Sequence, residues 1–161
     1  MPLVKSTLSS ALQAVLESKP DPTASAASDW AQAYLSYAAS AMSSVSSLAT
    51  NAAGNQGILV GAFSSAFQSQ DTSGAASTIA SGVMSFWQAI VWSGASAVGS
   101  TASPGNFSLS SALSGIFSDT GEASAGEKAN RLADAFDAGA KQVMVMDVLT
   151  STGVPVVGPI Q

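Results

Sequence analysis

The stretch SAGEKANRLADAFDAGAKQVMVMDVL, residues 124–149, contains the signals that decide the class of fold. Ser124 and Glu127 have the spacing of a capping box, in which each side chain satisfies a backbone N–H group at the start of a helix. An apolar stripe follows at helical spacing: Leu132, Ala133, Phe136 and Ala140. After Ala140 the apolar residues are Val and Met without a helical period, which indicates a β-strand. The stretch therefore predicts a helix followed by a strand.

A second extended segment, residues 154–160, follows a turn at Ser151-Thr152-Gly153, so the C-terminus is predicted to form a β-hairpin. Pro155 and Pro159 cannot donate ladder hydrogen bonds, which favours an edge position for the last strand. A lone hairpin is marginally stable in water and must pack on the helices or pair with a partner's strand. We expect the partner contacts at six apolar residues: Val143, Val145, Val148, Val154, Val156 and Ile160.

Helical patterns also fill most of the chain before residue 124. We expect helices from Pro2 to the Lys19–Pro22 break, over 23–47 with Asp21 as its cap, over 58–68, over 75–92 and from Ser108. Residues 51–57 and 94–107 are predicted connections rich in turn residues. The predicted fold is mainly α: a bundle of about five or six helices (residues 1–142) with a short C-terminal hairpin segment (143–161) packed on the same domain or on a partner.

Composition excludes many chemistries. The chain has 161 residues, of which 30 are Ala and 30 are Ser, and it has neither His nor Cys. Without these two residue types there is no Ser-His-Asp triad, imidazole metal ligand, thiolate nucleophile or disulfide. A net charge of −5 argues against a nucleic-acid partner, which requires clustered Lys and Arg.

Membrane insertion is also disfavoured. The most apolar stretch, Ile79 to Val98, is interrupted by several Ser and one Gln, and no Lys or Arg flanks it. The N-terminus has no continuous apolar run after Lys5, so it does not resemble a signal peptide. We expect a buried core helix and no membrane partner.

The few charges are unevenly distributed. Asp71 is the only charged residue between Trp30 and Ser118, whereas the other charges lie before residue 30 or between Asp119 and Asp147. One interpretation is a helical domain with a neutral polar surface. The other is a surface covered by neighbouring subunits, because interface cores are depleted in charge.

Three groups of residues have the outline of a chemical site. Gly121 and Gly126 are spaced as in a phosphate-binding loop, but the next residue is Glu127 where that loop has Lys, and the capping box explains the same residues. Asp119, Glu122 and Glu127 could hold a hard cation, although their spacing fits no EF-hand and a solvated acidic loop explains them.

Asp134 and Asp137 are the third group, a pair of carboxylates on one helix, where we expect a salt-bridged solvent face near Arg131 and Lys141. Ion pairs are predicted at Glu127–Arg131 and Asp137–Lys141. We therefore expect no catalytic residue, cofactor or metal, and a protein that is not an enzyme. The eleven aromatic residues are predicted to anchor one core, and the alternative is a helical carrier with an apolar ligand pocket near Trp87 and Phe63.

The opening MPLVKSTL (1–8), WAQAY (30–34), SFWQA (85–89), LADAFDA (132–138) and the ending with Gly158-Pro159-Ile160 resemble small Ala/Ser-rich accessory virion proteins of tailed bacteriophages. The chain also looks somewhat like the Ser/Ala-rich helical domains of spider silks, without their repeats. The first resemblance implies a non-enzymatic structural subunit of the head–tail junction (neck), tail or baseplate. Its partners would be copies of itself or other structural proteins, in a virion assembled in the host cytoplasm; the alternative location is secreted.

Overall fold

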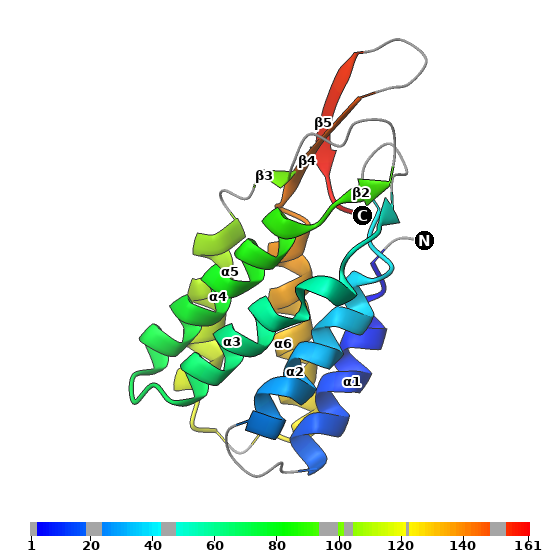
Figure 1. Cartoon of the computed structure of the whole chain (residues 1–161). Helices are drawn as coiled ribbons and strands as arrows, with labels where there is room; N and C mark the ends of the chain where they lie inside the picture. Colours follow the sequence, from blue (N-terminus) through cyan, green and yellow to red (C-terminus); the bar gives the residue numbers. More distant parts are fainter. Residues whose placement is uncertain are drawn as a thin grey trace.

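Six α-helices form the body of the described chain, and short strands gather at one end of it (Figure 1). The computed structural model describes residues 3–18, 24–42, 48–93, 100–101, 105–121, 123–148 and 154–161. The helices are α1 (Lys5–Ser18), α2 (Ala24–Ala38), α3 (Gln56–Phe67), α4 (Thr72–Ala89), α5 (Gly105–Ser118) and α6 (Ala125–Ala140), with a 3-10 turn, η1, at Ala53–Asn55. The mainly helical fold predicted from the sequence is confirmed.

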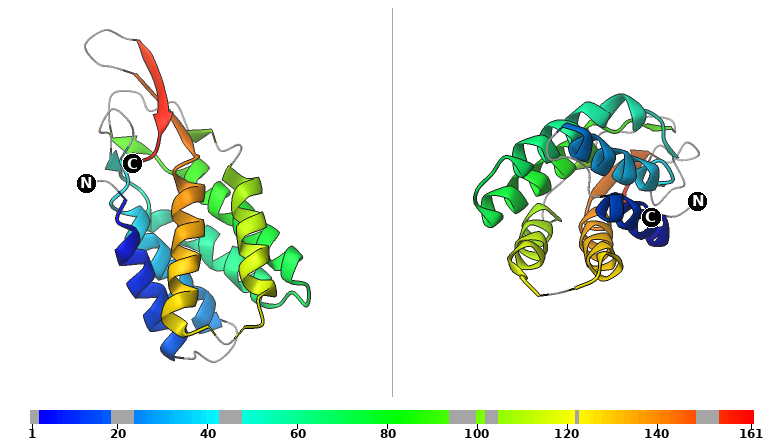
Figure 2. Two further views of the ribbon diagram at one scale, coloured as in Figure 1. Left: turned by 180° about the vertical axis from the view of Figure 1, so that it is seen from behind. Right: turned by 90° about the horizontal axis from the view of Figure 1, so that it is seen from below.

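The helices are arranged as a closed ring. Each helix packs against the helix before and after it in the chain, and α1 packs against α6. Viewed along the bundle, the six helices follow one another around a circle in sequence order (Figure 2, right). A ring without a central helix has an interior that Ala and Ser side chains are too small to fill.

Aromatic side chains fill this interior. Eight aromatic side chains are buried: Trp30, Tyr34, Tyr37, Phe63, Phe86, Trp87, Trp92 and Phe136. Their rings contact one another in a connected cluster. The ring centroids are 5.6 Å apart for Trp30 and Phe63, 6.4 Å for Phe63 and Phe136, and 5.2 Å for Phe136 and Tyr34. Tilted and edge-to-face contacts at these distances stabilise aromatic pairs beyond simple burial. The prediction that the aromatics anchor one core is confirmed for these residues.

Two helix starts have the caps that short-range chemistry favours. Ser124 Oγ accepts from the Glu127 N–H, and the Glu127 carboxylate accepts from the Ser124 N–H at 2.8 Å, so the predicted capping box is present. At the start of α4 the Asp71 carboxylate accepts from the N–H groups of Ser73 and Gly74. These bonds satisfy backbone donors that have no partner inside the helix.

Two helix ends differ from the prediction for non-local reasons. The second helix ends at Ala38, and Met42 pairs in both directions with Gln161, Met42 N–H to Gln161 O at 3.2 Å and Gln161 N–H to Met42 O at 2.9 Å. The fourth helix ends at Ala89, whose carbonyl accepts from the side chains of Asn51 and Asn55. In both places the hydrogen-bond partners lie far away in the sequence, so a local pattern could not indicate them. The predicted Asp21 cap lies outside the described residues.

The strands form two small antiparallel sheets. In one, β1 (Leu48–Ala49) pairs with β2 (Trp92–Ser93). In the other, the order is β3 (Ser100–Thr101), β4 (Met144–Val148), β5 (Pro155–Pro159). The predicted hairpin and the edge position of its last strand are confirmed, and the hairpin extends beyond the helices (Figure 1).

Candidate functional site

One side of the helix ring carries almost no charge. Its three helices, α3, α4 and α5, contain no Asp, Glu, Lys or Arg, and Asp71 is used as the cap of α4. The exposed positions described for these helices are small or polar: Gly57, Gly61 and Ser65 on α3; Thr72, Ser73, Ser77, Ser81, Ser85 and Gln88 on α4; Ser111, Ala112, Gly115 and Ser118 on α5. We call these residues the uncharged surface.

The ion pairs of the described residues all involve α6 or the residue that follows it, with partners on α1, on α6 or in the loop before α6. Lys5 of α1 forms an ion pair with Asp134 of α6, and the neighbouring Ser9 donates a hydrogen bond to Asn130. Polar side-chain contacts therefore join these two helices. Lys141 pairs with Asp137 at 2.7 Å, as predicted. The predicted Glu127–Arg131 pair is wrong, because Arg131 pairs with Asp119.

Asp137 is not on the solvent face where the sequence placed it. It is 8% exposed, and its Oδ1 accepts a hydrogen bond from the Tyr37 hydroxyl at 2.8 Å while Oδ2 faces Lys141. Burial raises the pKa of Tyr37 well above its ordinary value of 10.0, so this hydroxyl stays protonated and donates. Since Asp134 pairs with Lys5 instead, the two carboxylates have separate structural partners.

A second buried hydroxyl lies beside this pair. Tyr34 accepts a hydrogen bond from Trp87 Nε1 at 2.8 Å, and burial raises its pKa above the ordinary 10.0. Both bonds join α2 to other helices of the ring. They satisfy polar atoms inside an aromatic core, where an unpaired group would cost about 1–3 kcal/mol.

The acidic loop before α6 is also occupied by structural contacts. The Asp119 carboxylate accepts from Arg131 and from the Gly121 N–H, and these bonds lower its pKa below 3.8. The Glu127 carboxylate is held by Ser124 and its pKa is lowered below 4.5. Glu122 lies outside the described residues. Among the residues described, no three Asp, Glu, His or Cys side chains form a group that could hold a metal ion.

The two faces of the hairpin differ in exposure. Val143, Val145 and Ile160 are at most 1% exposed and belong to the chain's own core. Their side chains are therefore covered by the helices of the same chain, and a partner could reach them only if the hairpin left the bundle. Val154 is 52% exposed and Val156 is half-buried, and contact at these two residues stays a prediction. The side chain of Val148 lies outside the described residues.

Sequence reasoning missed the residues that the hairpin does expose. Cross-strand partners share a face, and the pairs Met144–Pro159 and Met146–Val157 lie on the face opposite to the buried residues Val143, Val145 and Ile160. Val157 is 56% exposed, and Met144 and Met146 are half-buried. The described side chains of this outer face, those of Met144, Met146, Val157 and Pro159, are all apolar.

The free edge of β5 has few hydrogen-bond donors. Ile160 N–H donates to Val143 O, so the alternating positions Val156, Gly158 and Ile160 direct their backbone groups toward β4. The outward positions are therefore Pro155, Val157 and Pro159, and proline has no N–H. Along β5 the outward edge offers only the N–H of Val157, so it is poorly suited to the addition of another strand.

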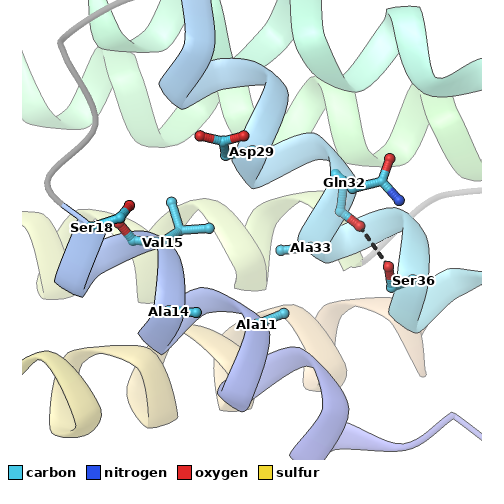
Figure 3. A pocket seen from close by; sticks show the side chains of 8 residues that line it. All are labelled: Ala11, Ala14, Val15, Ser18, Asp29, Gln32, Ala33 and Ser36. Carbon is cyan, nitrogen blue, oxygen red and sulfur yellow. Dashed lines mark hydrogen bonds between the residues drawn. The ribbon is translucent and has the colours of Figure 1, made fainter.

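The structure also has hollows between its helices. An open groove of about 370 Å³ separates α1 from α2 and is lined mainly by small side chains, with Ser36 bonded to the Gln32 carbonyl (Figure 3). Two further cavities lie inside the end of the ring beside Trp30 and Phe117. Trp87 and Phe63, beside which a pocket is expected, are 0% and 1% exposed and packed among other aromatics, and neither lines the hollows described here.

Comparison with known proteins identifies no relative. Neither the scan against protein-family models nor the searches of curated proteins and of solved structures finds a match. None of the described helices is long and apolar enough to cross a membrane. The surfaces and cavities of the chain are therefore the features from which its function can be inferred.

Proposed function

We propose that the chain is a non-enzymatic structural subunit that associates, through its uncharged surface, with copies of itself and with other structural proteins of a particle. The observation that carries the proposal is the separation of charge: the exposed positions described for α3, α4 and α5 are Ser, Thr, Gly, Ala and Gln. Surfaces that stay in water usually carry about 25–35% charged residues of both signs. Surfaces buried between subunits are depleted in charge.

Two exposed glycines support a packed surface. Gly61 and Gly115 lie inside helices, where glycine costs about 0.5–1 kcal/mol relative to alanine. A Cβ atom added at either position would meet nothing within 4 Å of its own chain. Packing inside the subunit therefore does not explain these glycines, whereas the close approach of a neighbouring backbone would.

The resemblance to accessory virion proteins of tailed bacteriophages extends the proposal to a component of the neck, tail or baseplate, assembled in the host cytoplasm. The outer face of the hairpin, with Met146 and Val157 at its centre, adds a second contact region. Its proline-bearing edge favours contact through side chains over pairing of strands.

The test is the mass of the purified chain in solution, measured by size-exclusion chromatography with light scattering. We expect a mass above the 15.9 kDa of one chain. Ser81→Arg should lower that mass because it places an unpaired charge in the contact, and Ser10→Arg, on the exposed face of α1, should leave it unchanged. A wild-type chain that stays monomeric at every concentration, or equal masses for both variants, would overturn the proposal.

A further inference from the structure

The end of the helix ring near Trp30 contains two adjoining cavities that the proposed function does not use. One is about 310 Å³ and lies between α1, α2, α5 and α6; the other is about 230 Å³ and lies between α2, α3, α4 and α5. Trp30 and Phe117 line both of them. Together they reach the size of small-ligand pockets, roughly 300–1,000 Å³.

The walls are apolar and reachable from solvent. Ile79, Leu132 and Trp30 are 0%, 3% and 8% exposed and form the inner walls. Four further apolar side chains are only half-buried and pack against the core at the mouth: Leu16, Phe67, Ile116 and Phe117. An apolar body placed here would complete the burial of these side chains.

One wall carries a cation without a partner. Lys5, Arg131 and Lys141 each form an ion pair. Lys128 lines the larger cavity, and its ammonium has no hydrogen-bond or ion-pair partner among the residues that the structure describes. The acidic group beside it, Asp119, is already bonded to Arg131. The Asp119 and Arg131 charges cancel within their ion pair, and Lys128 lies close enough to help lower the pKa of Asp119. Asp71, on the wall of the smaller cavity, is held by the N–H groups of Ser73 and Gly74. Lys128 is therefore the charged side chain of these walls that no hydrogen bond or ion pair engages among the described residues.

We infer that this cavity binds a small amphipathic anion, a carboxylate with an apolar body. The body lies between Trp30 and Phe117, and the carboxylate pairs with the Lys128 ammonium. Charge selects the class of ligand, since a cation would be repelled by Lys128 and a neutral apolar molecule would leave the ammonium unpaired. The inference is independent of the proposed assembly, because it concerns the interior of one end of the ring and not the exposed faces of α3–α5.

The test uses decanoate and, as its uncharged counterpart, decanol, with binding measured by isothermal titration calorimetry and by the indole N–H signal of Trp30 in NMR spectra. We expect the wild-type chain to bind one decanoate. Lys128→Gln should weaken decanoate binding about tenfold, the value of one charge-assisted hydrogen bond, while leaving decanol binding unchanged. Lys5→Gln removes a positive charge that is paired with Asp134 and should leave the binding of decanoate as in wild type.

A third variant tests the cavity itself. Ala75 lines the smaller cavity, and Ala75→Phe would fill it and weaken both probes if the ligand body lies there. Circular dichroism establishes that each variant is folded. Equal decanoate affinity in wild type and Lys128→Gln, binding of decanol alone, or no binding by the folded wild-type chain would overturn the inference.

Discussion

A single added methyl group tests how closely α3 and α4 pack. Gly82 of α4 faces Ala62 of α3, and a Cβ atom placed on Gly82 would lie 2.1 Å from the Ala62 Cβ. Carbon atoms in contact are about 3.5–4.0 Å apart, so Gly82→Ala would force the two helices to separate by roughly 1.4 Å. The neighbouring atom is a short side chain on a helix and cannot turn away.

The expected effect is the difference between two opposed contributions. Overpacking of a core costs about 1–3 kcal/mol, and replacing a glycine inside a helix by alanine returns about 0.5–1 kcal/mol. Gly82→Ala should therefore lower the free energy of unfolding by about 1–2 kcal/mol. Gly61→Ala on α3 is the matched control, because a Cβ there meets nothing within 4 Å and only the helix gain of about 0.5–1 kcal/mol remains.

Urea denaturation followed by tryptophan fluorescence measures both changes, at a protein concentration low enough to keep the chain monomeric. The midpoint should fall for Gly82→Ala and rise for Gly61→Ala at an unchanged m-value. Adding Ala62→Gly to Gly82→Ala removes the clashing methyl group and should recover most of the lost stability. Equal midpoints for Gly82→Ala and Gly61→Ala, or no recovery in the double variant, would refute the packing of α3 on α4 described above.

Three further predictions concern the polar contacts. Tyr37→Phe should cost about 2 kcal/mol of unfolding free energy, because buried Asp137 loses its hydrogen bond. A double-mutant cycle with Asp137→Ala, which removes the acceptor, measures the coupling by urea denaturation, and a coupling of zero would contradict the bond. Ser124→Ala should cost about 1 kcal/mol through loss of the α6 cap, whereas Ser77→Ala, exposed within α4, should cost nothing; equal midpoints would contradict the cap. The melting temperature should fall below pH 4.5, because the lowered pKa of Glu127 stabilises the fold only while this group is ionised in both states. It should also fall above pH 10.0, because the raised pKa of Tyr37 keeps the folded hydroxyl protonated while the unfolded chain ionises. A melting temperature that is flat across both limits would contradict these pKa shifts.

Helix starts could be predicted from the sequence where the determinants are local. Ser124 and Glu127 lie three residues apart, so their mutual caps depend on nothing distant. Helix ends were predicted less well, since the carbonyl of Ala89 is satisfied by Asn51 and Asn55, which lie more than 30 residues earlier. A propensity pattern contains no information about a partner that the fold brings from elsewhere.

Burial of charged groups was another limit. The spacing of Asp137 and Lys141 predicted their ion pair correctly, but the same spacing placed Asp137 in solvent. The structure buries it because Tyr37, 100 residues earlier, provides a hydrogen bond. The cavity beside Trp30 and Phe117 was missed for a related reason: its walls come from all six helices, and only the closed ring brings them together.

The hairpin shows why a correct strand prediction did not identify the exposed residues. Residues 143–146 alternate Val and Met, and both are apolar, so this alternation alone does not reveal which set faces the helices. The strand register reveals which set faces the helices: Val145 pairs with Gly158 on the buried side, and Met146 pairs with Val157 on the exposed side. The prolines of β5 follow the same alternation, and they stand at the outward positions of its free edge. A strand that is apolar on its outer face and blocked along this edge can bind a partner through side chains while resisting uncontrolled strand addition. This combination suits the proposed structural subunit, which would have to assemble without aggregating.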